Sequence, residues 1–224
     1  LWLEVVHSRH FGGLQGRADM FYQWNKSLSS GHPATTIINS YYGLVLFNLV
    51  WADIVGNARA SDFWYHVYCC TYGDDNVLNI DEAMIPYFNQ ATIAEGMSKY
   101  GMTYTNEKKD GEVANTRTLS EISFLKRGFR YEKPLRVYVG PLELESALYT
   151  AYWARSKKLM HQNTKDNLEF SWSELSLHDP EVWDKYAPVM RSIYKERMSC
   201  EPKHFFTRDN YLDITMSLVP LWDK

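Results

Sequence analysis

The sequence has 224 residues, of which 45% are hydrophobic and 23% are charged, and its formal net charge is −3. It has enough apolar residues to bury the core of one large domain or two small ones. The slightly acidic balance argues against a protein that coats nucleic acid through overall positive charge. The three cysteines are odd in number and form no C-x-x-C pair. Neither a disulfide framework nor a zinc site is therefore indicated, and a reducing compartment is the default expectation.

The start of the sequence and its longest apolar stretch bear on whether the chain is a fragment and whether it crosses a membrane. The sequence begins at Leu1 without an initiator methionine, a basic leader or a signal-like apolar run, so we expect a fragment of a longer protein. Residues 37–55 are interrupted by polar residues such as Asn48 and Asp53, which is typical of a buried helix. No transmembrane segment is predicted.

In chain order, residues 1 to about 11 are typical of the end of a helix, and a glycine-rich link follows. A long, mostly buried helix is predicted from near Pro33 to near Gly56, because proline suits the first turn of a helix. Aromatic and β-branched residues then lie on both sides of Gly73, Asp74 and Asp75. This pattern predicts two short strands joined by a tight turn.

The second half of the sequence changes from short strands to helices. Residues 86–100 predict a helix that Gly101 ends, and a short strand and a polar turn should follow. Residues 121–140 predict two or three short strands. The short strand is predicted at residues 102–105, and helices are predicted at roughly 141–158 and 179–198. Candidates for the core are Trp172, Trp183 and Tyr186.

The predicted hairpin tip carries two adjacent carboxylates, Asp74 and Asp75. Hard carboxylate oxygens can bind Mg²⁺ and leave positions open for substrate phosphates. Aspartates are equally ordinary in hairpin turns, where the side chain bonds its own backbone. The pair taken alone therefore leaves open a metal site or a polar turn.

The predicted long helix carries a second group of polar residues near its start. Thr35 and Asn39 are four residues apart, so a hydroxyl and an amide lie on one face of the helix and can reach the same partner. Ser30 and Gly31 should form a pliable loop just before them. Local capping or bonding to the helix backbone is the alternative interpretation.

Basic residues form the third group. Lys108 and Lys109 lie in the predicted polar turn, where a mobile lysine could neutralise or protonate a leaving pyrophosphate. From Lys126 to Arg136, five basic residues stand against one acid, with aromatic residues between them. This segment could contact a phosphate backbone. A solvated turn and a solvated strand face are the alternatives.

These groups follow one another as S-G-x-x-x-T-x-x-x-N-S, then Y-G-D-D on a hairpin, then a helix, a strand and a lysine, then F-L-K-R. In this order they resemble motifs B, C, D and E of the RNA-dependent RNA polymerases of positive-strand picorna-like viruses. The specific part of the resemblance covers about residues 27–130. It implies an α+β fold with a right-hand polymerase palm over residues 1–134, built as a small antiparallel sheet backed by helices, and a mainly helical thumb over residues 135–224.

The resemblance implies roles for the polar residues of the hairpin and the helix. Asp74 would be the main ligand of Mg²⁺, or of Mn²⁺ in its place, with Asp75 beside it. Thr35 and Asn39 would help to recognise the ribose 2′-hydroxyl of the incoming nucleotide, by which such a site prefers ribonucleotides.

The resemblance also implies roles for the flanking loop and the basic residues. Ser30 and Gly31 would lie in the loop that touches the templating base pair. Lys109 would be the general acid, and Lys126 and Arg127 would lie near the primer strand.

The activity so implied is template-directed nucleotidyl transfer from an NTP to an RNA 3′-hydroxyl by a two-metal mechanism. The expected partners are RNA template and primer, NTPs and other viral replication proteins, at membrane-associated replication complexes in the host cytoplasm. The aspartate-bearing strand of motif A would precede Leu1, so we expect this fragment to be inactive by itself.

Three alternatives stay open at this point. A reverse transcriptase also places Tyr-x-Asp-Asp on a hairpin, although the Thr35 and Asn39 pair and F-L-K-R argue against it. A nucleic-acid-binding or scaffold module would use the carboxylates only as a turn. A metal-dependent hydrolase would need histidines or further carboxylates near the hairpin, where His66 is the nearby candidate.

Overall fold

The computed structural model describes residues 9–12, 20–23, 28, 33–153, 160–202 and 205–217. The chain divides into two compact units, Leu1–Thr116 and Arg117–Lys224. This division lies before the predicted palm–thumb boundary at residue 134, which stays a prediction because compactness alone does not define palm or thumb. The predicted α+β class is confirmed, since small antiparallel sheets are combined with helices in both units.

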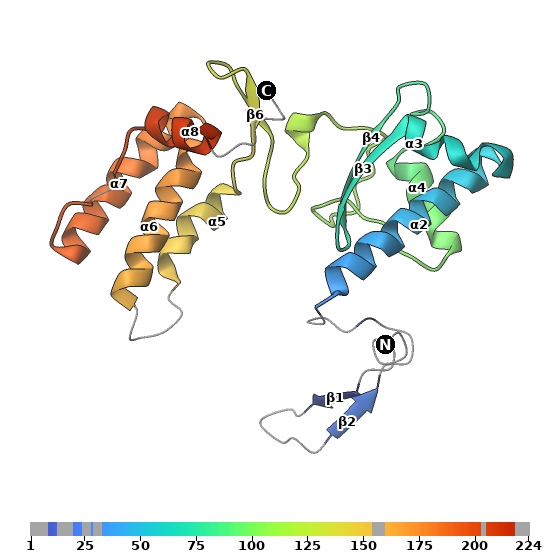
Figure 1. Ribbon diagram of the computed structural model, residues 1–224, viewed down its shortest axis with the longest axis horizontal. Helices are drawn as coiled ribbons and strands as arrows, with labels where there is room; N and C mark the ends of the chain where they lie inside the picture. Colours follow the sequence, from blue (N-terminus) through green and yellow to red (C-terminus); the bar gives the residue numbers. More distant parts are fainter. Residues whose placement is uncertain are drawn as a thin grey trace. The chain divides into compact units, whose positions relative to one another are not determined.

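The first unit contains a small hairpin at its start, one long helix, a second hairpin and a shorter helix (Figure 1). Its elements are β1 (Arg9–Gly12), β2 (Met20–Gln23), α2 (Thr35–Val55), the 3₁₀ helix η2 (Asn57–Asp62), α3 (Phe63–His66), β3 (Val67–Tyr72), β4 (Asp75–Ile80) and α4 (Gln90–Lys99).

The expected end of a helix over the first eleven residues is wrong where the structure describes it. Residues Arg9–Gly12 form β1, which pairs antiparallel with β2 so that Phe11 is opposite Phe21. Pairing with a strand that follows a glycine-rich connection supplies backbone hydrogen bonds that the local sequence does not reveal.

Helix α2 lies where the sequence predicts it. It starts at Thr35, two residues after Pro33, and it ends at Val55, before Gly56, whose φ of 85° is available to glycine without strain. Its second half carries the side chains that enter the core: Leu46, Phe47, Val50 and Trp51.

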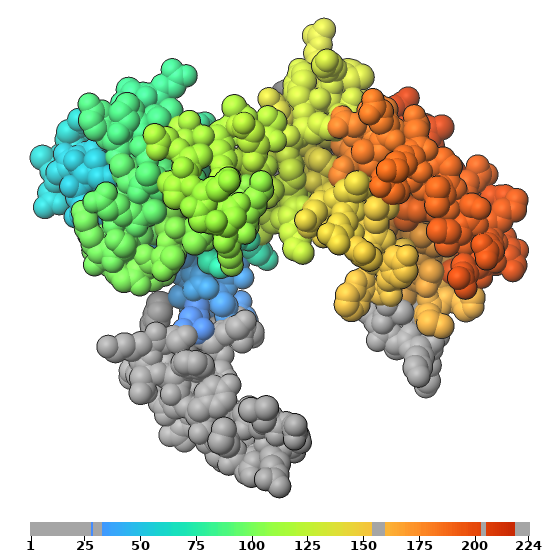
Figure 2. Space-filling view, turned by 180° about the vertical axis from the view of Figure 1, so that it is seen from behind, coloured from blue at the N-terminus to red at the C-terminus, as the bar shows by residue number. Residues whose placement is uncertain are grey.

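The length and apolar composition of α2 would also allow it to cross a membrane. The same properties are found in the core helix of a folded domain, and α2 packs against both β3 and α4. The expectation that this helix is mostly buried is wrong, because only the four core side chains of its second half are buried. The space-filling view shows the part of the chain coloured cyan to green, from the end of α2 to α4, as one continuous packed body (Figure 2). The predicted absence of a transmembrane segment stays a prediction.

The predicted hairpin is confirmed as β3 and β4, which pair in register from Val67 with Ile80 to Tyr72 with Asp75. Burial alternates along β3, as it should in a strand with one face on a core. Residues Cys69, Leu78 and Ile80 of the inner face pack on the core cluster of the first unit. The hydrophobic face of the hairpin therefore anchors it to α2.

Helix α4 begins and ends with recognisable caps. Asn89 accepts hydrogen bonds from the backbone of Ala91 and Thr92, and the Thr92 hydroxyl in turn accepts one from the Asn89 N–H. At the other end, Gly101 with a φ of 75° takes the position that the sequence predicts for the end of the helix. The strand predicted over residues 102–105 is wrong, because this segment pairs with no strand among the described residues.

The second unit is a short hairpin followed by helices. Its elements are the 3₁₀ helix η3 (Leu119–Glu121), β5 (Arg130–Glu132), β6 (Val137–Val139), α5 (Leu144–Tyr149), the 3₁₀ helix η4 (Thr150–Tyr152), α6 (Met160–Ser176), α7 (Pro180–Met198) and α8 (Arg208–Ser217).

Helix α6 is the centre of the second unit, although the sequence did not predict it. It contacts α5, α7 and α8. Leu168, Trp172 and Leu175 form its buried stripe, whereas most of its other residues are polar, which hides the helical period. Trp172 is fully buried and packs edge-on against Phe205 at 4.9 Å between ring centroids. The predicted helix at 179–198 is confirmed as α7.

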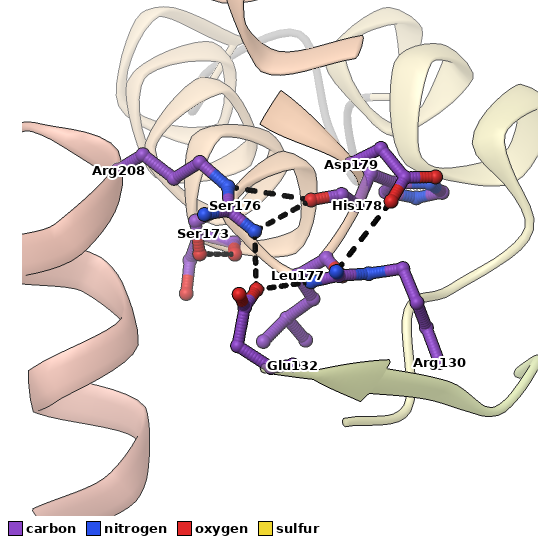
Figure 3. A network of polar contacts seen from close by, with 8 residues as sticks. All are labelled: Arg130, Glu132, Ser173, Ser176, Leu177, His178, Asp179 and Arg208. Atoms are coloured by element: carbon purple, nitrogen blue, oxygen red, sulfur yellow. Dashed lines mark hydrogen bonds and ion pairs between the residues drawn. The ribbon is translucent and has the colours of Figure 1, made fainter. Parts of the chain in front are cut away.

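A network of charged groups ties β5 to the helices of the second unit (Figure 3). The carboxylate of Glu132, which is 4% exposed, accepts hydrogen bonds from the guanidinium groups of Arg130 and Arg208. Arg208 also donates to the His178 carbonyl at 2.9 Å, and Arg130 donates to the Leu177 carbonyl at 2.9 Å. Both arginines thereby bridge the buried carboxylate and the turn between α6 and α7.

Candidate active site at the β3–β4 turn

The GDD turn, which consists of Gly73, Asp74 and Asp75, joins β3 to β4. Gly73 has a φ of 67°, whereas Asp74 is not among the residues with positive φ. This pattern fits a two-residue type II′ hairpin turn, in which glycine takes the first central position. The glycine is therefore required by the backbone, and the two carboxylates that follow it are placed at the exposed tip of the hairpin.

The two carboxylates have no competing partner in the part of the chain that the structure describes. Among the described residues, the side chains of Asp74 and Asp75 take part in no hydrogen bond or ion pair, and both residues are exposed. Nor does that part of the chain contain a group of three or more His, Cys, Asp or Glu residues that could hold a metal ion. Mg²⁺ is commonly bound through one or two carboxylates plus substrate phosphates. The pair fits such an open, incomplete site and does not fit a closed structural one.

Hydrogen bonds hold the backbone of the GDD turn from two sides. The Gly73 N–H donates to the Ser40 hydroxyl of α2 at 2.8 Å. The Asn76 side-chain amide donates to the Asp74 carbonyl at 3.2 Å and accepts from the Tyr104 hydroxyl at 2.7 Å. Of these residues, only Ser40 belongs to the S-G-x-x-x-T-x-x-x-N-S pattern, and no function was assigned to it from the sequence. Nothing in the sequence pointed to Asn76 or Tyr104.

The bond from Ser40 brings the first turns of α2 next to the GDD turn. Thr35 and Asn39 lie on these turns, four residues apart, and both are half-buried. The structure therefore places the face that carries a hydroxyl and an amide on the helix that contacts the carboxylate-bearing turn. Ser30 and Gly31, which the sequence assigns to the loop before this helix, lie outside the described residues.

Lys109 lies in the polar turn that the sequence predicts after α4. It has a φ of 54°, and its N–H donates to the Asn106 carbonyl at 3.2 Å. Its side chain is exposed and forms no ion pair with Asp74 or Asp75 in the described part of the chain. A backbone hydrogen bond therefore holds the turn at Lys109, and the side chain of Lys109 is exposed to solvent.

Lys126 and Arg127 belong to the second unit and differ from each other. Lys126 is exposed at a tight turn closed by the bridge between Phe124 and Arg127. The Arg127 guanidinium donates to both carboxylate oxygens of Glu174, at 2.8 and 2.9 Å, and to the Gly140 carbonyl at 2.7 Å. Such a bidentate pair is a strong, oriented interaction. Arg127 therefore has a clear structural role, and its predicted contact with the primer stays a prediction.

Comparison with known proteins identifies the family. Residues 17–195 match the family model described as viral RNA-dependent RNA polymerase. The chain belongs to this family. It is 34% identical over its whole length to a replicase polyprotein of Drosophila C virus, of which it covers 13%. It is also 34% identical, over 88% of its length, to a replicase polyprotein of acute bee paralysis virus, of which it covers 11%.

A third relative is the genome polyprotein of deformed wing virus, which is 32% identical over 69% of the chain. The chain covers 6% of that polyprotein. Membership of the picorna-like group of RNA-dependent RNA polymerases, which the motif order predicted, is thereby confirmed. The chain spans only a small part of the length of these relatives.

Proposed function

We propose that this chain contributes part of the active site of an RNA-directed RNA polymerase, which transfers a nucleotide from an NTP to the 3′-hydroxyl of RNA. The observation that carries the proposal is the GDD turn, where two carboxylates without a partner among the described residues stand at a tip held by Ser40 of α2. Family membership supports this activity, and the incomplete metal site agrees with a centre that takes its remaining ligands from elsewhere.

Asp74 and Asp75 would hold Mg²⁺, or Mn²⁺ in its place, with Asp74 as the main ligand. Two metal ions at such a site stabilise both the attacking and the leaving oxygen of an in-line displacement. A further carboxylate from the expected motif A strand, which this chain does not contain, would complete the set. The role of the chain would be to present the two carboxylates at a tip that Ser40 and Asn76 hold by hydrogen bonds.

The first turns of α2 would select the incoming nucleotide. The Thr35 hydroxyl and the Asn39 amide can exchange hydrogen bonds with a ribose 2′-hydroxyl, which distinguishes RNA precursors from DNA precursors. Ser30 and Gly31 would touch the templating base pair from the preceding loop.

Lys109 would act on the leaving pyrophosphate, and Lys126 would act on the primer strand. Lys109, exposed in its turn, would protonate or neutralise the leaving pyrophosphate. Lys126 would contact the primer strand together with Arg127, through charge that a phosphate backbone attracts. The partners are RNA template, primer and NTPs, with other viral replication proteins, at membrane-associated complexes in the host cytoplasm.

The decisive experiment replaces Asp74 by Asn in the full-length protein and measures primer-dependent incorporation of NTPs on an RNA template. The expected result is loss of RNA synthesis, because the amide removes the negative charge that binds the metal ion. Asp184→Asn is the matched control, since Asp184 is exposed on α7, and it should synthesise RNA at the wild-type rate. Unchanged synthesis in Asp74→Asn would overturn the proposal in favour of a scaffold role.

The same assay with deoxynucleotides separates this function from that of a reverse transcriptase. The wild-type protein should incorporate ribonucleotides in preference, and Asn39→Ala should reduce that preference because the 2′-hydroxyl loses a partner. Equal use of both nucleotide classes by the wild-type protein would contradict the ribose-sensing role of α2.

A further inference from the structure

The backbone of the GDD turn has two polar groups that hydrogen-bond to neighbouring side chains, and they come from consecutive residues. The Gly73 N–H is bound by Ser40, which lies on α2 next to Asn39. The Asp74 carbonyl is bound by Asn76, the first residue after the carboxylate pair. The peptide group between Gly73 and Asp74 lies between these two hydrogen-bonded peptide groups, so it has little freedom to rotate. The direction of the Asp74 side chain therefore depends on the two contacts.

The contact through Asn76 reaches further into the unit. The Tyr104 hydroxyl donates to the Asn76 side-chain carbonyl at 2.7 Å, which orients the amide so that its NH₂ group faces the Asp74 carbonyl. Tyr104 lies five residues before Lys109, in the segment between α4 and the polar turn. A single chain of hydrogen bonds therefore connects this segment to the metal-binding turn.

Tyr104 is suited to act as a fixed donor. Its ring packs edge-on against Phe47 of α2, with 5.9 Å between ring centroids. Burial, together with the nearby Cys69, raises the pKa of its hydroxyl well above the ordinary tyrosine value. The hydroxyl therefore keeps its proton throughout the neutral and mildly alkaline range, and the bond to Asn76 does not depend on pH there.

We infer that Ser40 on one side, and Asn76 with Tyr104 on the other, are positioning residues that aim the metal-binding carboxylates of the GDD turn. This inference rests on the proposed polymerase function. It makes the turn a junction between the helix that carries the ribose-sensing residues and the segment that leads to the proposed general acid, Lys109. Movement of either segment on nucleotide binding would be transmitted to Asp74.

These bonds are not needed to hold the hairpin as a whole. The inner face of β3 and β4 is already anchored by Cys69, Leu78 and Ile80 on the core, and the two strands pair along their full length. The bonds from Ser40 and Asn76 act only at the tip. Their loss should therefore change metal binding and catalysis more than it changes folding.

The test uses the full-length protein with Ser40→Ala and Tyr104→Phe, each of which removes one hydroxyl and keeps the rest of the side chain. We expect each to lower kcat by about tenfold, because small displacements of catalytic groups are costly, and to raise the Mg²⁺ concentration for half-maximal activity. The KM for NTP should change less. Ser40→Thr keeps a hydroxyl at the same place and should restore both quantities.

Two matched controls lie in the same unit. Ser98→Ala removes an exposed hydroxyl of α4 that bonds only its own helix, and Tyr100→Phe removes a hydroxyl that donates to the exposed Asp53. Both should leave kcat and the Mg²⁺ requirement unchanged. The thermal midpoints of all four variants should stay close to that of the wild-type protein, and Tyr104→Phe decides the case if Ser40→Ala fails to fold.

The outcome for Asp74→Asn separates the positioning role from the polymerase function. If Asp74→Asn abolishes synthesis while Ser40→Ala and Tyr104→Phe keep the wild-type kcat and Mg²⁺ requirement, the positioning role is overturned and the polymerase function stands. A fall in kcat that Ser40→Thr does not rescue, or that is matched by the controls, also overturns the positioning role. Full activity of Asp74→Asn overturns the polymerase function itself.

Discussion

The hairpins β3–β4 and β5–β6 are held in opposite ways. The first rests on its apolar face, with Leu78 and Ile80 against the core, and both carboxylates at its tip are unpaired in the described structure. The second is tied down through a carboxylate, because Glu132 is buried between Arg130 and Arg208 (Figure 3). Apolar anchoring leaves charged groups available for a ligand, whereas ionic anchoring occupies them.

A second pair of carboxylates, Glu174 and Asp74, shows the same contrast. Glu174 is 9% exposed at its side chain and is fully engaged by Arg127, so it cannot serve a metal ion without breaking that pair. Asp74 has no such engagement in the described part of the chain. Glu174 is therefore held in a structural pair, whereas Asp74 is open to a ligand, and this difference can be tested by substitution.

The largest effect is expected from Glu132→Ala. Two half-buried arginines would lose the buried carboxylate that they share, and breaking such a pair costs about 3 to 5 kcal/mol of the free energy of unfolding. Urea denaturation followed by tryptophan fluorescence measures it. Glu145→Ala, at an exposed position of α5, is the control and should have little effect. A small loss for Glu132→Ala would mean that the second hairpin does not depend on its ionic anchor.

The apolar anchor of the first unit is tested by Gly96→Ala. A Cβ atom at Gly96 of α4 would stand 2.5 Å from Cγ1 of Val50 on α2. Although alanine favours a helix, we expect a loss of about 1 to 3 kcal/mol from overpacking. Gly43→Ala on α2 is the matched control, because its Cβ would meet open space, and it should be neutral or stabilising.

A double substitution sharpens this result. If the clash with Val50 is the cause, Val50→Ala should make Gly96→Ala less costly than in the wild-type background, so that the two effects are not additive. The same urea denaturation measures the losses. If they are additive, the clash with Val50 is not the reason why Gly96→Ala is destabilising.

The pH dependence of stability tests the ionic anchor at Glu132. Burial by itself would raise the pKa of Glu132, but the hydrogen bonds and charges of Arg130 and Arg208 outweigh it and lower the pKa. A carboxylate whose pKa is lower in the folded state stabilises the protein above its unfolded pKa, and this contribution is lost as the pH falls through the folded pKa. The stability difference between the wild-type protein and Glu132→Gln should therefore shrink below about pH 4.3. Urea midpoints between pH 7 and pH 3 measure it, and a difference that is constant with pH would contradict the ionic anchor.

The smallest effect on stability is expected from Asp74→Asn and Asp75→Asn. Both carboxylates are exposed and have no partner in the described structure, so their loss should leave the thermal midpoint within the error of the wild-type value. Thermal unfolding followed by circular dichroism checks this. A clear destabilisation would show that these groups support the hairpin as Glu132 does, and the contrast between the two hairpins would disappear.

Much of the candidate site could be predicted from sequence because it depends on neighbours along the chain. The glycine before Asp74 and Asp75 specified a tight turn, and the i, i+4 spacing placed Thr35 and Asn39 on one helical face. The order of four short patterns predicted the polymerase family. Helix α6 escaped prediction because its buried stripe, built around Trp172, is diluted by polar residues, and β1 escaped because a strand is defined by its partner.

The turn, the long helix and the family could all be inferred from sequence, since they follow from backbone preferences and spacing within short segments. Tertiary packing, in contrast, selects which charged and polar groups are engaged. It paired Arg127 with Glu174, forty-seven positions apart, and it brought Ser40 and Tyr104 to the GDD turn. Hydrogen bonds between distant segments depend on how apolar faces pack, and for that reason the support of the site became visible only in the fold.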